Sequence, residues 1–325
     1  MSVTRSSFVK AQVKDSYGYF MEKYDAIRPV KDLLFDIESS DASYEQYTSA
    51  IGPGSITKVA EGVSIPRQSA QEGYTVYCAN YKYPTELPLT NEAIDDNQKI
   101  KNFLKAWASG LGETYRNKEE SDHADLFNYG GFTAGHVTFD NSIPAVITPS
   151  YGNFIYDGKP LFALTGNNHP AKNGNTYYNS IASLTLSSQN LETICKLIKV
   201  TNAFNEAGAE ITIMPDTLLV QEGSANFYKA KRILESMGDI DSAHSGVSNV
   251  WKNSLNLVGW RHLTNADAFF VGVAKRGLKS LARMAPKIDY YEDQNHDSQI
   301  VRARARWGKA VDNFRFWVGA NLATS

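Results

Sequence analysis

The feature that most constrains this chain is a long extended stretch, residues 63–89, with little apolar content of its own (VSIPRQSAQEGYTVYCANYKYPTELPL). Its two halves flank a polar turn at 68–73, and the second half alternates with the period of two that is typical of a β-strand. One face carries Tyr74, Val76 and Cys78, and the other carries Thr75, Tyr77 and Ala79. An isolated hairpin is marginally stable in water. The stretch therefore predicts a hairpin that needs a partner surface.

A long amphipathic helix is predicted next, over residues 91–129. Thr90 suits the N-cap, and acidic side chains follow in the first turns, where the helix dipole favours them. The apolar stripe at helical spacing consists of Ile100, Phe103, Leu104, Trp107, Leu111 and Tyr115. Gly110 and Gly112 lie within the helix and cost about 0.5–1 kcal/mol each relative to Ala, so they predict a weak point or a bend.

The rest of the chain mixes strands and helices, which indicates an α+β protein. Residues 1–30 suggest an extended or partly helical arm, and 132–186 suggest strands and loops rich in Gly, Pro and Asn. Further helices are predicted from about 188 to 207 and from 224 to 238. The C-terminal region reads as strands joined by a charged turn.

Composition excludes several classes of protein. The chain has 325 residues and a net charge of −2, which argues against a protein built mainly to grip nucleic acid. Its two cysteines, Cys78 and Cys195, lie in apolar patterns and suggest a reduced, cytosolic assembly compartment. The N-terminus lacks the apolar core of a signal peptide, and no apolar run approaches a membrane span of ~20 residues.

His169 is the first candidate for chemistry, in the loop LFALTGNNHPAKNGN. Its neighbours are turn-forming residues, and the other histidines show no close ligand spacing. Neither cysteine forms a C-x-x-C pair. We therefore predict a structural loop in preference to a catalytic or metal-binding histidine.

A second candidate is the acidic segment DYYEDQNHD. Its possible metal ligands are Asp289, Glu292, Asp293, His296 and Asp297. The segment lacks the central Gly and the terminal Glu of a calcium loop. We predict a solvated turn between two strands, and a divalent cation bound at a subunit contact is the alternative.

Three arginines form the third candidate. Arg302, Arg304 and Arg306 alternate with alanines, which places their guanidinium groups on one face of a strand. No aromatic residue is interleaved with them as a stacking platform, so pairing with carboxylates is favoured over nucleic-acid binding. That pairing could lie within the subunit or across an interface. No phosphate-binding or nucleophile motif is present, so we predict no catalytic, cofactor-binding or metal-binding residues.

The order of these parts resembles the major capsid proteins of tailed bacteriophages with the HK97-type fold, and more specifically the Mu-like major head subunit group. Three segments carry the closer resemblance, and it covers the chain from about residue 60 onward. They are PLFALTGNNHPAKNG before the second helix, ITIMPDTLLVQEG leading into the third helix, and RARARWGKAVDNFRFWVGAN near the C-terminus.

The resemblance implies a division of the chain into capsid domains. The implied parts are an N-terminal arm with the first P-domain elements (1–60), an E-loop (61–90), a P-domain (91–209) with its spine helix (91–129), an A-domain (210–285) and C-terminal strands returning to the P-domain and A-domain (286–325). Some shells of this fold crosslink through an E-loop lysine. Lys82 lies in the predicted hairpin, but no matching Asn and Glu pair can be assigned, so no crosslink is predicted. A subunit without residues 64–86 is expected to fold but to form no stable shell.

The resemblance also implies the function. It implies a major capsid (head) protein, not an enzyme, that assembles into pentamers and hexamers of an icosahedral shell around phage double-stranded DNA. The shell would form in the bacterial host cytoplasm and become part of the virion. An encapsulin-like nanocompartment shell, a soluble hydrolase and a DNA-binding protein are the alternatives.

The expected partners follow from this function. They are copies of the chain itself, a portal protein, packaged DNA bound without sequence specificity, and in some shells a decoration or cement protein. No membrane is expected. Because the sequence begins at Met1, we expect no fused scaffolding segment and therefore a separate scaffolding protein.

Overall fold

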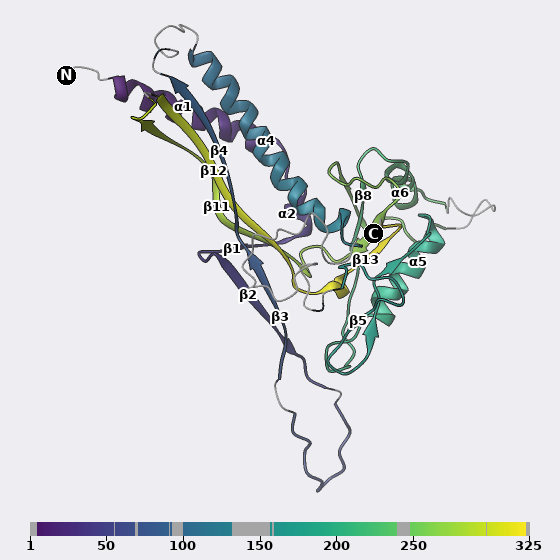
Figure 1. The fold of residues 1–325 in the computed structure, drawn as a ribbon. Helices are drawn as coiled ribbons and strands as arrows, with labels where there is room; N and C mark the ends of the chain where they lie inside the picture. Colours follow the sequence, from purple (N-terminus) through teal and green to yellow (C-terminus); the bar gives the residue numbers. More distant parts are fainter. Residues whose placement is uncertain are drawn as a thin grey trace.

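The chain folds into an arm, a compact body and a projecting hairpin (Figure 1). A computed structural model describes residues 5–54, 56–68, 71–90, 92, 100–131, 157, 159–238, 248–296 and 298–322. Within these ranges it confirms the predicted mixture of helices and strands, the α+β class. No helix of the described residues is long and apolar enough to cross a membrane.

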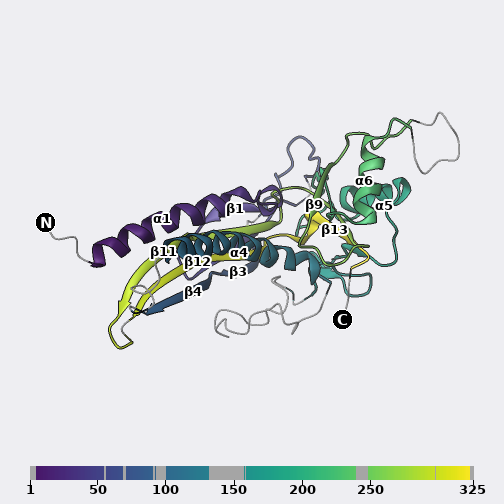
Figure 2. The ribbon, with the colours of Figure 1, turned by 90° about the horizontal axis from the view of Figure 1, so that it is seen from above.

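The arm is a four-stranded sheet covered on one face by two long helices, α1 (Arg5–Ala26) and α4 (Ile100–Asn128). The strand order is β1-β11-β12-β4, with β1 parallel to β11 and the other pairs antiparallel. Their bounds are β1 (Asp36–Ser39), β4 (Tyr81–Thr90), β11 (Leu278–Asp293) and β12 (Ser298–Val311). Figure 2 shows both helices lying along these strands.

Alternation along β12 explains why the helices cover only one face. Ala303, Ala305 and Trp307 are buried in the cluster that joins this sheet to both helices. The helices contribute Phe20, Tyr24, Ala108, Leu111 and Tyr115 to the same cluster. The two alanines are small, so the helices can lie close to the strands. The arginines between them point to the opposite face, because successive side chains of a strand alternate.

The observed α4 confirms most of the predicted long helix and corrects two details. Its predicted beginning at 91–99 lies, except for residue 92, outside the described residues. Leu104 and Leu111 are buried, but Phe103 is 47% exposed, so its place in the stripe was wrong. The helix is continuous from 100 to 128 and does not break at the glycines. A Cβ on Gly112 would lie 2.3 Å from the Phe20 carbonyl oxygen, so this glycine permits close packing of α1.

The body contains a five-stranded sheet and two helices. The strand order is β7-β13-β10-β8-β9. The strands are β7 (Ser180–Ile181), β8 (Thr217–Gln221), β9 (Asn256–Trp260), β10 (Phe269–Gly272) and β13 (Trp317–Ala320). The helices are α5 (Ser188–Lys196), which continues as the π-helical turn η1 (Leu197–Thr201), and α6 (Ala225–Glu235). Both α-helices begin at a serine, Ser187 or Ser224, whose hydroxyl accepts a backbone N–H.

Aromatic side chains fill the core of the body. Phe127, from the last turn of α4, makes edge-to-face contacts with Phe35, Trp260, Phe270 and Trp317. All five rings are buried, and such pairs contribute about 0.5–1.5 kcal/mol beyond their area. The long helix therefore runs from the arm into the body and joins their cores.

The hairpin differs from the one predicted. Its strands are β2 (Tyr44–Ile51) and β3 (Gln71–Ala79), which pair antiparallel across a long connection. The predicted pairing across the turn at 68–73, between the stretch before it and the stretch after it, was wrong, because β3 pairs with β2 and β4 pairs with β12 from Ser298↔Thr90 to Trp307↔Tyr81. Asn80 separates β3 from β4. Its side-chain amide donates to Ser40 Oγ and to the Ala42 carbonyl, which fixes the chain between the two strands. The partner of β4 is thus in the same chain.

Three of the expected domain boundaries can be compared with the observed elements. The extended hairpin spans 44–79, so the range 61–90 combines one of its strands with a strand of the arm. The boundary expected at 209 separates α5 from β8 and α6, although all three share the body core. The boundary expected at 285 falls within β11. The remaining short elements are α2 (Lys31–Leu34), β5 (His169–Pro170), β6 (Thr176–Tyr177) and the 3-10 turn η2 (Phe314–Phe316).

Candidate assembly surfaces

His169 is a buried structural residue, as predicted for its loop. Its Nδ1 lies 2.7 Å from Asp157 Oδ2, and its Nε2 lies 3.3 Å from the Leu161 carbonyl oxygen. The ring stacks on Phe314 with 3.9 Å between centroids. Both ring nitrogens are therefore occupied by protein oxygens, and the fully buried ring has no path to a substrate. Its role is to fasten the β5–β6 ribbon to the C-terminal turn.

The acidic segment between β11 and β12 forms a turn, and its carboxylates do not converge. Asp293 Oδ2 lies 2.8 Å from His296 Nδ1, which, together with its backbone hydrogen bonds, lowers the pKa of Asp293. Asp289 points to the arginines of β12. Within the described residues, which omit Asp297, no group of three or more His, Cys, Asp and Glu side chains could hold a metal ion. The metal-site alternative therefore has no ligand set there.

The arginines of β12 occupy the sheet face opposite the helices, together with neighbours on β4 and β11. Asp289 Oδ2 lies 2.6 Å from Arg304 Nη2 and 3.9 Å from Arg302 Nη2. This confirms the predicted carboxylate pairing within the subunit for these two arginines. Lys82, the lysine considered for crosslinking, lies on β4 directly opposite Arg306. We call this side of the sheet the open face.

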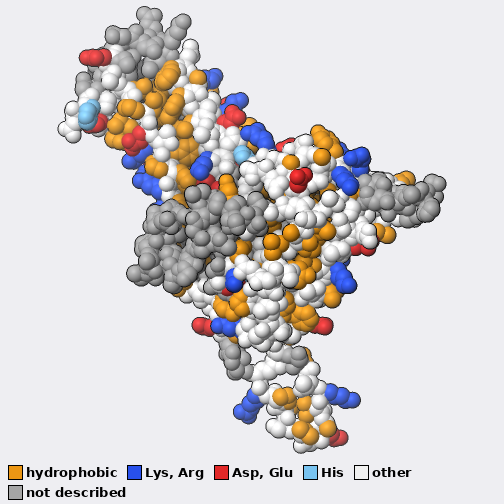
Figure 3. Space-filling model, turned by 45° about the vertical axis from the view of Figure 1, so that its right-hand side comes forward, with side chains coloured by type: hydrophobic (Ala, Val, Ile, Leu, Met, Phe, Trp, Pro, Cys, Tyr) orange, Lys and Arg blue, Asp and Glu red, His pale blue; other side chains and the backbone are white. Residues whose placement is uncertain are grey.

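The connection between β2 and β3 carries apolar side chains into solvent. Ile56 is 95% exposed, Ile65 is 81% exposed and Val63 is 59% exposed. Figure 3 shows apolar atoms gathered at this tip, flanked by charged side chains. The opposite end of the hairpin is anchored in the chain, where Val76 and Cys78 pack on Leu281 and Ala310. The sequence placed Val63 and Ile65 in the first half of the predicted hairpin, whose need for a partner surface was the signal, and it gave no signal for Ile56.

A small cavity lies where the hairpin meets the body. It has a volume of about 100 Å³, and Tyr47 and Tyr74 line it from the hairpin side. Glu206 and Arg315 line the body side, and their side chains form a buried ion pair with 2.6 Å between Oε1 and Nη1. The side chain of Asn205 donates to the Pro53 carbonyl. The hairpin therefore touches the body through this hydrogen bond and through the residues that line the cavity.

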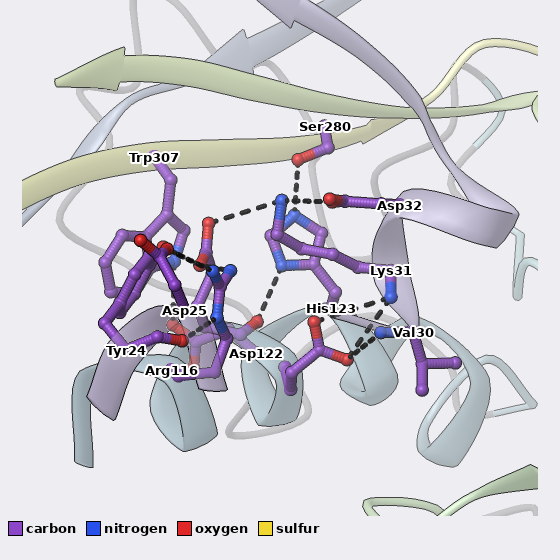
Figure 4. A network of polar contacts seen from close by, with 12 residues as sticks. Tyr24, Asp25, Val30, Lys31, Asp32, Arg116, Asp122, His123, Ser280 and Trp307 are labelled. Atoms are coloured by element: carbon purple, nitrogen blue, oxygen red, sulfur yellow. Dashed lines mark hydrogen bonds and ion pairs between the residues drawn. The ribbon is translucent and has the colours of Figure 1, made fainter. Parts of the chain in front are cut away.

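A buried polar network joins α1, α4 and the sheet (Figure 4). The Tyr24 hydroxyl donates to Glu119 Oε2 at 2.5 Å, and Arg116 Nη1 lies 3.1 Å from the same oxygen. Glu120 Oε2 accepts from the Val30 backbone N–H and from Trp260 Nε1, each at 3.0 Å. The network thus links the arm helices to the body. The charged run at 116–125 resembles a solvated helix face in the sequence, but its folded partners bury it.

His123 and its neighbours show how strongly this network is desolvated. Nδ1 of His123 donates to the Glu119 carbonyl, and Nε2 accepts from the Ser280 hydroxyl. Burial lowers the pKa of His123 to about 3, so the ring is neutral at pH 7. Burial also raises the pKa of Glu120 and of Asp125. The network therefore lies inside the fold, where it holds α1, α4 and the sheet together.

Comparisons with solved structures show which proteins share this fold. The capsid of an empty GTA particle has a TM-score of 0.54 and 10% sequence identity, with 91% of each chain covered. The capsid of the cyanophage P-SCSP1u has a TM-score of 0.51 and 10% identity, covering 92% of this chain and 89% of that chain. The native GTA capsid gives a TM-score of 0.53 at 10% identity.

Sequence comparisons are less informative. No family model matches the chain. An LL-diaminopimelate aminotransferase of Methanocaldococcus jannaschii is 25% identical over 157 residues, which is 47% of this chain. The chain spans 36% of the length of that enzyme, so the match transfers no activity. The solved capsids instead cover nearly the whole chain, and this protein has the HK97-type fold of tailed-phage capsids.

Proposed function

We propose that this chain is a major capsid protein, which assembles into the pentamers and hexamers of an icosahedral shell around phage double-stranded DNA. The observation that carries the proposal is the pairing of this fold, over 91% of the chain, with a hairpin whose apolar tip is exposed. A fold can be shared by proteins of different function, so the site must supply the rest of the argument.

The exposed tip of the hairpin supplies the second part of the argument. Ile56 and Ile65 are almost fully exposed, and burying one such side chain stabilises by about 1.5–3 kcal/mol. No described part of the subunit covers them, so the missing contact surface belongs to another molecule. A contact between different surfaces of identical subunits is heterologous and closes into rings when the rotation permits. Rings that are joined at their remaining edges form a shell.

In capsid terms, we propose that the arm is the P-domain and α4 its spine helix. The body would be the A-domain, and β2–β3 with its connection would be the E-loop, at 44–79 in place of 61–90. The subunit would act without catalysis. A separate scaffolding protein, a portal protein and, in some shells, a decoration protein would be its partners in the host cytoplasm, and the virion its final location.

Expression and imaging test the proposal. The chain should be produced in bacteria alone and together with a candidate scaffolding protein, and the products examined by electron microscopy. Icosahedral particles are the expected result, and a subunit that stays monomeric under all conditions would overturn the proposal. The contents separate the encapsulin-like alternative, because that compartment would hold a protein cargo where a phage shell holds DNA.

A further inference from the structure

The open face of the arm carries more positive than negative charge. Directly opposed residues of neighbouring strands share a face, and the register therefore assigns its members. Its members with charged or aromatic side chains are Lys82 and Glu86 on β4, Arg302, Arg304 and Arg306 on β12, and Lys287, Asp289, Tyr291 and, at the distal end, Asp293 on β11. Asp289 lies within 4 Å of Arg302, Arg304 and Lys287, so one carboxylate serves three cations.

One end of the open face has no carboxylate at all. Lys82 and Arg306 are directly opposite each other on β4 and β12, and Met284 is the neighbour of Arg306 on β11. Within the described residues, no ion pair engages either cation. Like charges placed directly opposite on adjacent strands are destabilising. The arrangement becomes favourable when an anion from outside the subunit lies between them.

A matching anionic element lies at the distal end of the same arm. Strand β11 ends with Glu292 and Asp293 just before the turn to β12, and the described residues from 292 to 296 include no lysine or arginine. Glu292 is exposed, and no ion pair engages it within the described residues. We call residues 292–296 the acidic tip. The acidic tip and the Lys82–Arg306 pair lie at opposite ends of one sheet, so they cannot meet within one subunit.

We propose that the acidic tip of one copy docks on the Lys82–Arg306 end of the open face of another copy. This inference rests on the proposed function, since it requires subunits that meet at their arms. Tip and face are complementary in charge, and each copy carries both, so the contact can repeat around a symmetry axis or be reciprocal between two copies. Charged contacts of this kind chiefly set register and partner choice.

A nucleic-acid backbone is the competing occupant, and the face suits it less. Asp289 lies between the arginines and Glu86 lies at the edge, where each would repel phosphates. Tyr291 already packs beneath Arg302, with its hydroxyl 3.1 Å from Glu86, so it offers no free ring for base stacking. The edge strand β4 also contains Pro84 and Pro88, which block addition of a further strand. Contact through side chains is the remaining mode.

Charge reversal with rescue tests the contact. Arg306→Glu removes no ion pair within the subunit, and Arg306→Lys is the matched control that keeps the charge. Particles would be counted by electron microscopy and light scattering, with circular dichroism and thermal melting of the unassembled subunit as the test of folding. We expect Arg306→Glu and Glu292→Lys to lose particles, Arg306→Lys to retain them, and the double variant R306E/E292K to regain them.

The outcomes separate this inference from the proposed function. A wild-type chain that forms no particles, either alone or with a scaffolding protein, would refute the shell itself. Particles formed normally by the folded Arg306→Glu variant would overturn only the tip contact. If Arg306→Glu loses particles and Glu292→Lys keeps them, the acidic tip is not the occupant. Added double-stranded DNA that binds the wild-type subunit and not Arg306→Glu would then identify nucleic acid in its place.

Discussion

The body and the hairpin use the same kind of side chain in opposite ways. In the body, Phe127 is fully buried among four other aromatic rings. At the hairpin tip, Ile56 and Ile65 are left in water. Because apolar burial is the main favourable contribution to folding, the body is stable within one subunit, whereas the tip gains that contribution only from a neighbour. Folding of one subunit therefore buries the body core, whereas the hairpin tip can be buried only when subunits assemble.

Truncating the aromatic core should have the largest effect on the stability of the subunit. Phe127→Ala is expected to lower the free energy of unfolding by about 3–5 kcal/mol, because it leaves a cavity among the surrounding rings. Urea denaturation of the unassembled subunit, followed by tryptophan fluorescence, measures this loss. The matched control Ile65→Ala should change stability by no more than about 0.5 kcal/mol. Similar losses for both variants would contradict the contrast between body and hairpin.

The pH dependence of stability should show the burial of His123. Its pKa is lowered to about 3 in the folded chain and is near 6.5 when unfolded, so only the unfolded state takes up the proton between these values. The stabilisation is complete above pH 6.5 and is lost as the pH falls toward 3, by at most about 1.4 kcal/mol per pH unit. Urea midpoints at pH 7.5, 6.5 and 5.5 measure it.

His123→Gln is the control for that titration. Burial raises the pKa of Glu120 and of Asp125, which has the opposite sign and favours the folded state as the pH falls. Both groups are present in the variant, so the difference between the two proteins isolates His123. If both proteins have the same slope between pH 6.5 and 5.5, the ring is not kept neutral by the fold.

Two glycines of α4 should respond in opposite directions. Gly112→Ala is expected to cost about 1–3 kcal/mol, because its Cβ would meet the Phe20 carbonyl oxygen of α1 at 2.3 Å. Gly110 has no atom within 4 Å of the same position, so Gly110→Ala should stabilise the helix by about 0.5–1 kcal/mol. Thermal melting of both variants measures the difference. A loss of stability in both variants would support the weak point or bend that the sequence predicted at these glycines.

The smallest change in stability, and the largest change in assembly, is expected at the hairpin tip. Replacing Ile56, Val63 and Ile65 together by serine should leave the unfolding transition of the subunit almost unchanged, since all three side chains are exposed. The same variant should form no stable particles by electron microscopy. Normal particles would exclude the tip as an assembly contact. This variant replaces a deletion of 64–86, which would also remove most of β4 from the arm sheet.

Local pattern predicted many elements because it depends on near neighbours in the chain. The alternation of arginine and alanine on β12 placed the alanines against the helices, and Ser187 and Ser224 begin their helices as capping residues do. For the loop around His169, the sequence predicted a structural segment, and the ring is buried against Asp157 and Phe314. The pairing of β4 was not predictable in this way, since its partner β12 lies more than 200 residues away.

By itself, the sequence determined most of the helix α4, the positions of α5 and α6, and the alternation of faces along β3 and β12. The periods of helices and strands are local properties of the chain, so they can be recognised without knowledge of the fold. Only the tertiary structure decided that β3 pairs with β2, that Glu119 and Glu120 are buried, and that Lys82 lies opposite Arg306. The physical reason is that a strand edge or a charge is satisfied by a partner in space, and many segments of the chain compete for that place.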